Sequence, residues 1–283
     1  MKIGIIGAGV VGRASGIGLE SKGHGVTFVD NDPSCLDELK ASGHEVHSSV
    51  SDIAQRSDIV MISVPTPTVS GRTDLHAILA VGEDIGLGLT GSSEYKLVVV
   101  RSTVPPRTTR KQLIPVLEAA SRKKAGPDFG VCFNPEFLRE QSALEDFLLP
   151  DRIVIGQFDQ HSGTMLESLY ESLQKPVVRC TLEEAELAKH VANAFLATKI
   201  SYFNEVHELC KGLGISSEVV SSVAALDSRI GSYGTIGGKP FRGKCLPKDL
   251  EAFLTFARDL GLRLDVLNAA VSVNQKAPLR QYA

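Results

Sequence analysis

A glycine-rich turn between a short apolar run and a helical pattern constrains the fold of this chain more than any other feature. Lys2–Ile6 predicts a strand, Gly7-Ala8-Gly9-Val10-Val11-Gly12 follows at once, and a helical pattern extends to about Gly23. The first glycine permits a tight turn, the second lets a pyrophosphate approach the backbone, and the third lets helix and strand pack closely. The helix N-terminus then faces the phosphates. This order predicts a dinucleotide-binding domain with cofactor contacts at Gly7, Gly9, Val10, Val11 and Gly12.

An acidic residue at the end of the next strand indicates which dinucleotide is bound. The apolar run Val26–Val29 ends in Asp30, whose carboxylate would accept hydrogen bonds from the adenosine ribose hydroxyls. No arginine follows within Asn31–Pro33, so a 2′-phosphate would meet negative charge without a partner. We therefore expect NAD in preference to NADP.

Strands and helices continue to alternate along the first half, which favours an α/β fold with a doubly wound, mostly parallel sheet. Further strands are expected within Asp58–Val64, Lys96–Val100, Gly130–Phe133, Arg152–Gly156 and Pro176–Arg179. Ligands of such sheets gather at the carboxyl ends of the strands. The residues expected there are Val64, Pro65, Thr66, Ser102 and Thr103, with helix capping as the alternative role of the hydroxyls. Pro105 and Pro106 are expected to open the next helix.

Two acidic residues follow the strand Gly130–Phe133. Glu136 and Glu140 are four residues apart, so one helical turn would stack both carboxylates on one face. A solvated helix face explains the same spacing. The position after a sheet strand favours a face that lines the cleft.

A long helix opens the second half. Thr181-Leu182-Glu183-Glu184 is a capping box, and the helical pattern runs from about Glu183 to Cys210 or beyond. Lys189 and Asn193 share one face, and Leu187, Val191, Ala194, Phe195 and Thr198 are expected to form a packing stripe. The expected organisation is a nucleotide-binding domain over residues 1–180 and a mainly helical domain over residues 181–283.

Cys245 lies behind a glycine-punctuated loop and directly before a helical pattern with Pro247 in its first turn. The helix N-terminus and the neighbouring Lys244 and Lys248 favour a thiolate, which is the nucleophilic form. A small buried apolar residue is the alternative, and the residues alone leave both open.

Composition excludes several classes of function. A net charge of -3 gives no electrostatic footprint for nucleic acid or for an anionic membrane. No apolar run reaches the length of a membrane span, and the start shows no signal peptide. Five scattered cysteines without metal-ligand spacing indicate reduced thiols, no metal site and a cytoplasmic location.

Taken together, these motifs closely resemble the UDP-glucose/GDP-mannose dehydrogenase family over nearly the whole chain. The further stretches that carry the resemblance are Pro150–Gly156, Lys189–Lys199, Arg229–Gly231 and Cys245–Asp249. It implies a Rossmann-type domain followed by a helical central domain of the type found at the C-terminus of 6-phosphogluconate dehydrogenase. It also implies NAD-dependent oxidation of a primary alcohol to a carboxylate, through a cysteine thiohemiacetal and a thioester.

The resemblance further implies roles for single residues. Lys189 and Asn193 would stabilise an oxyanion, and Cys245 would attack the aldehyde. Asp249 would orient a lysine or a water, while Glu136 and Thr103 would handle the hydrolytic water. The matching substrate contacts are Glu136, Phe137, Leu138, Glu140, Lys189, Asn193, Arg229, Phe241 and Gly243.

Two features depart from the family. Arg242 stands where the family usually has a glycine, which adds bulk and charge to the loop around the sugar. The sequence ends at Ala283, whereas full members carry a further nucleotide-binding domain. The expected substrate is therefore a nucleotide sugar or a smaller sugar or nucleoside alcohol. A two-electron dehydrogenase of the hydroxyacid type and a non-catalytic NAD-binding protein remain as alternatives.

The long helix also predicts how the protein assembles. Ile200, Phe203, Val206, Leu209 and Leu213 form an apolar stripe that a two-domain chain has little mass to cover. In the resembled family the central domain forms a two-fold dimer, and Arg229 would complete the site of the partner. We therefore expect a homodimer.

Overall fold

The computed structural model describes residues 1–243 and 245–276, which divide into two compact units. The first contains Met1–Pro67 and Asp74–Lys189, and the second contains Thr68–Thr73 and the chain from His190 onward. The boundary falls inside one long helix, α8 (Leu182–Leu213). The domain boundary expected after residue 180 stays a prediction.

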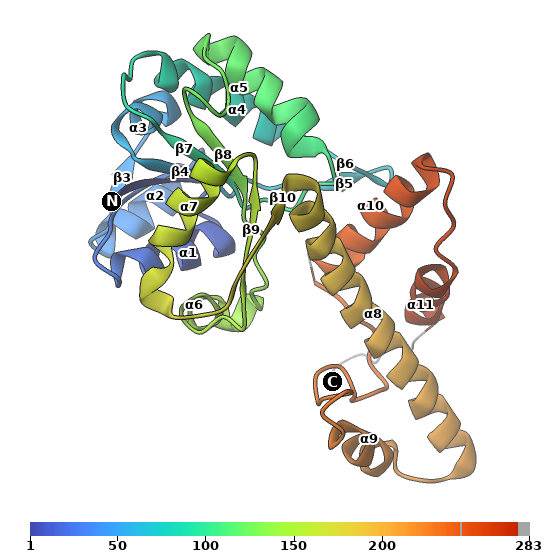
Figure 1. Ribbon diagram of the computed structural model, residues 1–283. Coiled ribbons are helices and arrows are strands. Elements are labelled where there is room, and N and C mark those ends of the chain that lie inside the picture. The colour runs from blue at the N-terminus through green and yellow to red at the C-terminus, as the bar shows by residue number, and fades with distance from the viewer. Residues whose placement is uncertain (244, 277–283) are drawn as a thin grey trace. The chain divides into compact units, whose positions relative to one another are not determined.

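The first unit is built on one large sheet. Among the described residues, eight strands form it in the order β10-β9-β8-β7-β4-β1-β2-β3 (Figure 1). The strands are β1 (Lys2–Ile6), β2 (Gly25–Val29), β3 (Glu45–His47), β4 (Ile59–Ile62), β7 (Leu97–Val100), β8 (Gly130–Phe133), β9 (Ile153–Gln157) and β10 (Val177–Thr181). Every neighbouring pair is parallel except β8 and β9, which are antiparallel. The central strands β4, β7 and β8 are buried along their whole length, as the continuous apolar runs predict.

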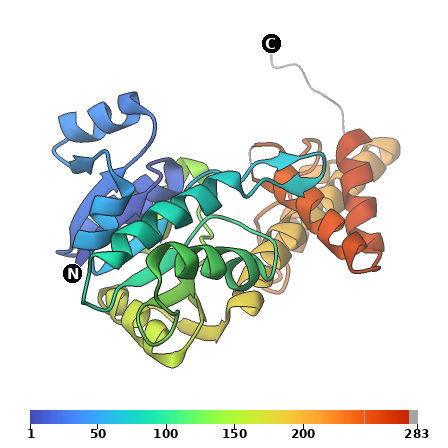
Figure 2. The same cartoon turned by 90° about the horizontal axis from the view of Figure 1, so that it is seen from above.

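Helices cover both faces of this sheet, which gives the unit two apolar cores (Figure 2). One face packs on α3 (Val50–Arg56), α4 (His76–Thr90), α5 (Ile114–Ser121) and the π-helical turn Thr109–Leu113. The other packs on α1 (Val10–Glu20), α2 (Pro33–Ala41), α6 (Ala143–Leu148) and α7 (Gln160–Leu169). Short 3₁₀ turns occupy Glu140–Ser142 and Glu171–Leu173. The predicted α/β class with a doubly wound sheet is confirmed.

The expectation that Pro105 and Pro106 open a helix is wrong. Both prolines lie in a turn, and the helical segment begins at Thr109. A proline disfavours helical backbone in the residue before it, so two in succession delay the start. Arg107 then adopts a left-handed conformation with φ of 77°.

The second unit is mainly helical. It contains part of α8, together with α9 (Ser217–Ala225), α10 (Leu246–Asp259) and α11 (Asp265–Lys276). A small antiparallel hairpin of β5 (Thr68–Val69) and β6 (Arg72–Thr73) belongs to this unit although it lies early in the sequence. The hydroxyl of Thr68 donates to the carbonyl of Lys248 at 3.1 Å, and Arg72 pairs with Asp259. The hairpin is thereby fixed to α10.

The start of α8 confirms the capping box. The backbone N–H of Thr181 donates to Glu184 Oε2 at 2.7 Å, and the N–H of Glu184 donates to Thr181 Oγ1 at 3.3 Å. Two of the unpaired amides at the helix start are thus satisfied reciprocally.

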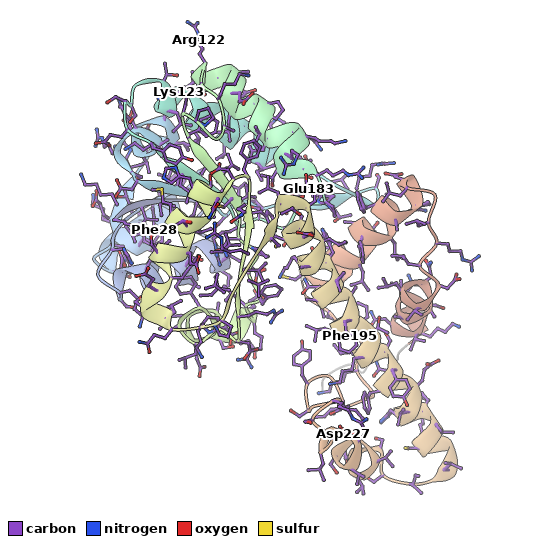
Figure 3. The ribbon with its side chains drawn as sticks, viewed as in Figure 1. Phe28, Arg122, Lys123, Glu183, Phe195 and Asp227 are labelled. Atoms are coloured by element: carbon purple, nitrogen blue, oxygen red, sulfur yellow. The ribbon has the colours of Figure 1, made fainter. Side chains whose placement is uncertain are left out.

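The predicted apolar stripes of α8 need correction. Phe203 is only 4% exposed because it packs within its own unit, so it is not available to a partner chain. Conversely Val191 and Phe195, expected to pack inside the chain, are 51% and 65% exposed. Figure 3 shows Phe195 pointing away from the helix axis. Leu209 and Leu213 are exposed as well. A run of apolar side chains on α8 therefore lacks cover within the described chain.

Three further properties concern the described residues as a whole. None of the five cysteines forms a disulfide there. No group of three or more His, Cys, Asp or Glu side chains gathers in a way that could hold a metal ion. The helices described are all too short or too polar to cross a lipid bilayer.

Candidate functional site

The glycine turn after β1 has the geometry that a dinucleotide needs. Gly7 has φ of 90°, and a Cβ there would lie 2.7 Å from the carbonyl oxygen of Ser63, so no other residue fits without strain. Gly9 is the N-cap of α1, where no side chain caps the helix, and a Cβ there would meet nothing within 4 Å. A Cβ at Gly12 would strike the carbonyl of Gly7. Val10 and Val11 form the first turn of α1 behind this open backbone.

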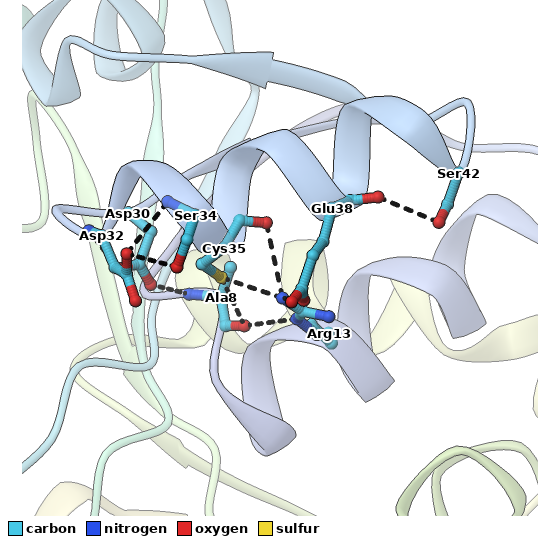
Figure 4. Close-up of polar contacts among 8 residues, drawn as sticks. All are labelled: Ala8, Arg13, Asp30, Asp32, Ser34, Cys35, Glu38 and Ser42. Atoms are coloured by element: carbon cyan, nitrogen blue, oxygen red, sulfur yellow. Dashed lines mark hydrogen bonds and ion pairs between the residues drawn. The ribbon is translucent and has the colours of Figure 1, made fainter.

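Asp30 lies against the same turn, as expected. Its Oδ2 accepts the N–H of Ala8 at 2.6 Å and its Oδ1 accepts the N–H of Asp32 at 2.9 Å (Figure 4). The remaining lone pairs of the carboxylate can accept two ribose hydroxyls. Together with the uncapped helix N-terminus, this arrangement fits an adenine dinucleotide.

Sequence reasoning missed Arg13, which binds the backbone of the same glycine turn. Its Nε donates to the carbonyl of Ala8 at 2.9 Å, and its Nη2 donates to Glu38 at 2.7 Å and to the sulfur of Cys35 at 3.2 Å (Figure 4). The pKa of Arg13 is raised, first by the hydrogen bond to Cys35 and then by that to Glu38. Its charge is thus engaged by Glu38 and does not favour a 2′-phosphate.

The hydroxyls at the ends of β4 and β7 do not cap helices but join two turns. Thr66 Oγ1 donates to the carbonyl of Thr103 at 2.7 Å, and Ser102 Oγ donates to the carbonyl of Val64 at 2.7 Å. Both hydroxyl protons are therefore used within the protein. The two turns, including Pro65, are held side by side at the carboxyl edge of the sheet.

Lys189 and Glu136 form a buried pair in the first unit. Lys189 Nζ donates to Glu136 Oε1 at 2.9 Å and to the backbone carbonyl of Glu136 at 2.7 Å. The two side chains are 5% and 9% exposed. Glu136 Oε2 accepts the N–H of Leu138 at 2.7 Å. The ammonium lies 5.5 Å from the ring centre of Phe137. Among the described residues Lys189 has two acceptors, which leaves its third N–H for a ligand.

The predicted stacking of Glu136 and Glu140 on one helix face is wrong. Residues 134–139 form no helix, and Glu140 begins a 3₁₀ turn. Pro135 disfavours helical backbone at Asn134, whose side-chain Nδ2 donates to the carbonyl of Val154. Glu136 is consequently buried, whereas Glu140 is exposed.

Asn193 and Asp249 form a second buried pair, and both residues belong to the second unit. Asn193 Nδ2 donates to Asp249 Oδ2 at 2.7 Å, and both side chains are buried. Asp249 Oδ1 lies 2.7 Å from Lys248 Nζ in a geometry that makes an ion pair but no hydrogen bond. The side-chain amide of Asn193 therefore positions the carboxylate of Asp249, and the ammonium of Lys248 balances its charge.

Cys245 is the N-cap residue of α10, with Pro247 in the first turn, as the sequence predicts. Its side chain is exposed, and its carbonyl accepts the N–H of Asp249 at 2.9 Å. The thiol thus stands at a helix N-terminus, one turn before a buried carboxylate. Lys244, the other expected neighbour, lies outside the described residues.

Two asparagines that sequence reasoning missed hold the loop before Cys245. Asn204 Oδ1 accepts the N–H groups of Gly238 and Lys239 at 2.8 and 3.1 Å. Asn274 Oδ1 accepts the N–H of Phe241 at 2.7 Å. Phe241 is buried against Leu250 and Ala197, whereas Arg242 and Gly243 are exposed.

Arg229 lies in the loop after α9 and pairs with a neighbouring carboxylate. Its side chain is 87% exposed, and its guanidinium binds Asp227, with Nη2 at 2.6 Å from Oδ2. Figure 3 labels Asp227 in the loop after α9. The role of Arg229 in the site of a partner chain stays a prediction.

Comparison with known proteins gives two adjoining matches. Residues 41–174 match the model of the UDP-glucose/GDP-mannose dehydrogenase family, NAD binding domain, and residues 183–276 match its central domain. Residues 2–75 also match a model described as NADP oxidoreductase, coenzyme F420-dependent.

Individual relatives agree with these matches. GDP-mannose 6-dehydrogenase of Pseudomonas savastanoi pv. phaseolicola is 36% identical over 97% of this chain and 68% of its own length. UDP-glucose 6-dehydrogenase AglM of Haloferax volcanii is 36% identical over 99% and 71%. The structure of a UDP-glucose dehydrogenase from Pyrobaculum islandicum superposes with a TM-score of 0.90 at 36% identity, covering 97% of this chain and 68% of that one.

Proposed function

Because the chain belongs to the UDP-glucose/GDP-mannose dehydrogenase family, we propose that it oxidises a primary alcohol of a nucleotide sugar to a carboxylate. It is an NAD-dependent oxidoreductase. The main support for the proposal is the set of contacts that two residues of α8 make. This helix places the buried ammonium of Lys189 on Glu136 and, one turn later, bonds Asn193 to Asp249, which follows Cys245 by one turn of α10.

In the first oxidation the alcohol oxygen loses its proton to water and the carbon loses a hydride, which leaves an aldehyde. NAD, held by the glycine turn after β1 and by Asp30, would supply the acceptor for this hydride. The N–H groups of Lys189 and Asn193 donate to the oxygen, on which negative charge develops. Both donors are already held by Glu136 and Asp249, so they need little reorganisation in the transition state.

In the second oxidation the thiolate of Cys245 adds to the aldehyde carbon and forms a thiohemiacetal. Loss of the hydroxyl proton to water, and of a second hydride from that carbon to a second NAD, gives a thioester. Water then breaks the carbon–sulfur bond, which releases the carboxylate and restores the thiol. Glu136 accepts a proton from this water and the hydroxyl of Thr103 orients it. One alcohol therefore reduces two NAD and consumes one water.

The same proposal covers substrate and location. GDP-mannose and UDP-glucose are in the names of the relatives, so a nucleotide sugar is the first choice of substrate. A smaller sugar or nucleoside alcohol is the second choice. The cytoplasm is the proposed compartment, because NAD and reduced thiols are available there.

We further propose a homodimer whose partner chain contributes Arg229 to each site. The exposed apolar residues Val191, Phe195, Leu209 and Leu213 of α8 support this assembly, since a symmetric dimer would cover the same patch twice. The exposed guanidinium of Arg229 is consistent with a target outside its own chain.

A substrate screen tests the proposal. The protein is incubated with NAD and, separately, GDP-mannose, UDP-glucose, other nucleotide sugars, sugar phosphates and nucleosides, and NADH is followed at 340 nm. We expect NADH with at least one nucleotide sugar. A complete lack of NADH with all of them would favour a non-catalytic NAD-binding protein.

A further inference from the structure

Glu186 is a buried carboxyl group that the mechanism above does not use. It is 0% exposed and lies on α8, three residues before Lys189. Its Oε2 accepts the backbone N–H of Arg107 at 2.6 Å, and its Oε1 accepts the backbone N–H of Thr109 at 2.8 Å. We propose that Glu186 is a positioning residue, which fixes the turn that carries Thr103 against the helix that carries Lys189. This inference rests on the function proposed above.

The turn in question connects β7 to the helical segment at Thr109. Its first half is tied to the sheet, through the bonds of Ser102 to Val64 and of Thr66 to Thr103. Its second half closes on itself, because Thr108 Oγ1 donates to the carbonyl of Pro105 at 2.7 Å. Glu186 then connects the end of the turn to α8 with two hydrogen bonds from a single carboxyl group. The turn and Glu186 both belong to the first unit.

The backbone at this end of the turn needs such support. Arg107 has φ of 77°, a left-handed conformation that is unfavourable for a residue with a Cβ. Such conformations persist where neighbouring contacts over-determine them, and they gather at functional sites. The bond from Arg107 N–H to Glu186 is one such contact. Without it, this amide would need another partner or water.

The pKa of Glu186 gives a measurable sign of the closed state, in which the turn is hydrogen-bonded to Glu186. Burial raises its pKa to about 7, and the hydrogen bonds from Thr109 and Arg107 oppose this rise only in part. The titratable neighbours on its own helix are Glu183, which raises the pKa further, Lys189, which is bound to Glu136, and the buried His190, one turn later. From the facing segment come Arg107 and Arg110, and Arg110 pairs with Glu183.

The sign of the pH effect follows from this shift. A carboxyl group with a raised pKa in the closed state is protonated more easily there than in an open, solvated state. Closure is therefore favoured at low pH and weakens as the pH rises through about 7. An uncharged residue at position 186 would abolish this dependence.

Three variants separate positioning from a merely structural role. Glu186→Gln sets an NH2 donor against one of the two backbone amides, which a protonated carboxyl group avoids because its hydroxyl oxygen can still accept. Glu186→Ala removes both acceptors, and Glu183→Gln is the matched control. Glu183 lies one turn earlier on α8, and its partner is the side chain of Arg110 rather than the turn backbone. Figure 3 labels Glu183 at the start of this helix.

The first measurement is hydrogen exchange at the amides of Arg107 and Thr109, which needs no substrate. We expect exchange about tenfold faster in Glu186→Gln and faster still in Glu186→Ala, with Glu183→Gln like the wild type. After correction for intrinsic rates, wild-type protection should fall between pH 6 and 8, and that of Glu186→Gln should stay flat. Unchanged protection in both Glu186 variants would overturn the proposal, and the wild-type pH series decides it even if Glu186→Ala fails to fold.

The second measurement is steady-state kinetics on the alcohol found by the screen. We expect kcat to fall about 10- to 100-fold in Glu186→Gln while the Kd for NAD changes less than about threefold, because misplacing a reacting group affects the chemical step more than binding. Faster exchange with an unchanged kcat would overturn the positioning role. If the wild type oxidises no alcohol, the proposed function fails, whereas faster exchange in the variants still supports the hold of Glu186 on the turn.

Discussion

Lys189 binds Glu136 twice, because its ammonium donates at 2.9 Å to Oε1 and at 2.7 Å to the backbone carbonyl of the same residue. Both side chains are nearly excluded from solvent. Such a pair has lost its hydration, so each charge depends on the other. The geometry fixes the ammonium and leaves one N–H for a developing oxyanion.

Replacing Lys189 by Met should impair both activity and stability. Loss of an oxyanion donor is expected to lower kcat about 10²- to 10³-fold. Glu136 would remain buried without its cation, at a cost of about 3 kcal/mol in the free energy of unfolding. Steady-state kinetics and urea unfolding measure the two effects. Lys211→Met, on the exposed last turn of the same helix, is the control and should change neither.

Asp30→Asn should weaken the binding of NAD and reduce the discrimination against NADP. The variant loses the charge that repels a 2′-phosphate and one strong acceptor for the ribose hydroxyls. We expect the Kd for NAD to rise about tenfold, in line with a hydrogen bond to a charged group. Calorimetric titration with both cofactors measures this change. Asp37→Asn removes a charge from the exposed side of α2 and should leave both affinities unchanged.

The raised pKa of Glu186 should appear in the pH dependence of stability. Burial raises the pKa of the Glu186 carboxyl group to about 7 in the folded protein, from an ordinary value of 4.5. Its contribution is thus fully present below pH 4.5 and is lost as the pH rises through about 7. Between pH 5.5 and 8.5 the wild type should lose on the order of 2 kcal/mol relative to Glu186→Gln in urea unfolding. A constant difference across this range would contradict the shift.

Phe195→Glu should dissociate the proposed dimer. The side chain is 65% exposed on the apolar side of α8, and a buried carboxylate in a two-fold interface would appear twice. Light scattering at micromolar concentration should give twice the mass of one chain for the wild type and one chain mass for the variant. Leu149→Glu, at an equally exposed site in the first unit, should remain dimeric. A fully active monomeric wild type would refute both the dimer and the role of Arg229.

Local patterns made much of this structure predictable. Gly7–Gly12, the run ending at Asp30 and the capping box at Thr181 depend on neighbours within a few residues, and each lies where the sequence predicts. The N-cap position of Cys245 was predictable for the same reason, since Pro247 fixes the start of α10.

Contacts between distant residues were not predictable in this way. Glu136 and Lys189 are 53 positions apart, and Glu186 lies 79 positions from Arg107. Helical spacing places Glu186, but not Glu184, on the face of Lys189 and Asn193, yet it does not show which distant backbone amides Glu186 meets. The stacking expected for Glu136 and Glu140 failed because residues 134–139 form no helix: the Glu136 carboxylate accepts the N–H of Leu138 and the ammonium of Lys189 instead.

The number of NADH formed per alcohol consumed tests the central claim most directly. The account predicts two NADH per alcohol and a carboxylate product, because Cys245 carries the aldehyde into a second oxidation. In Cys245→Ser the second NADH should vanish while NAD binding survives. A wild-type ratio of one NADH per alcohol, with an aldehyde or ketone as the product, would contradict the account and identify a two-electron dehydrogenase.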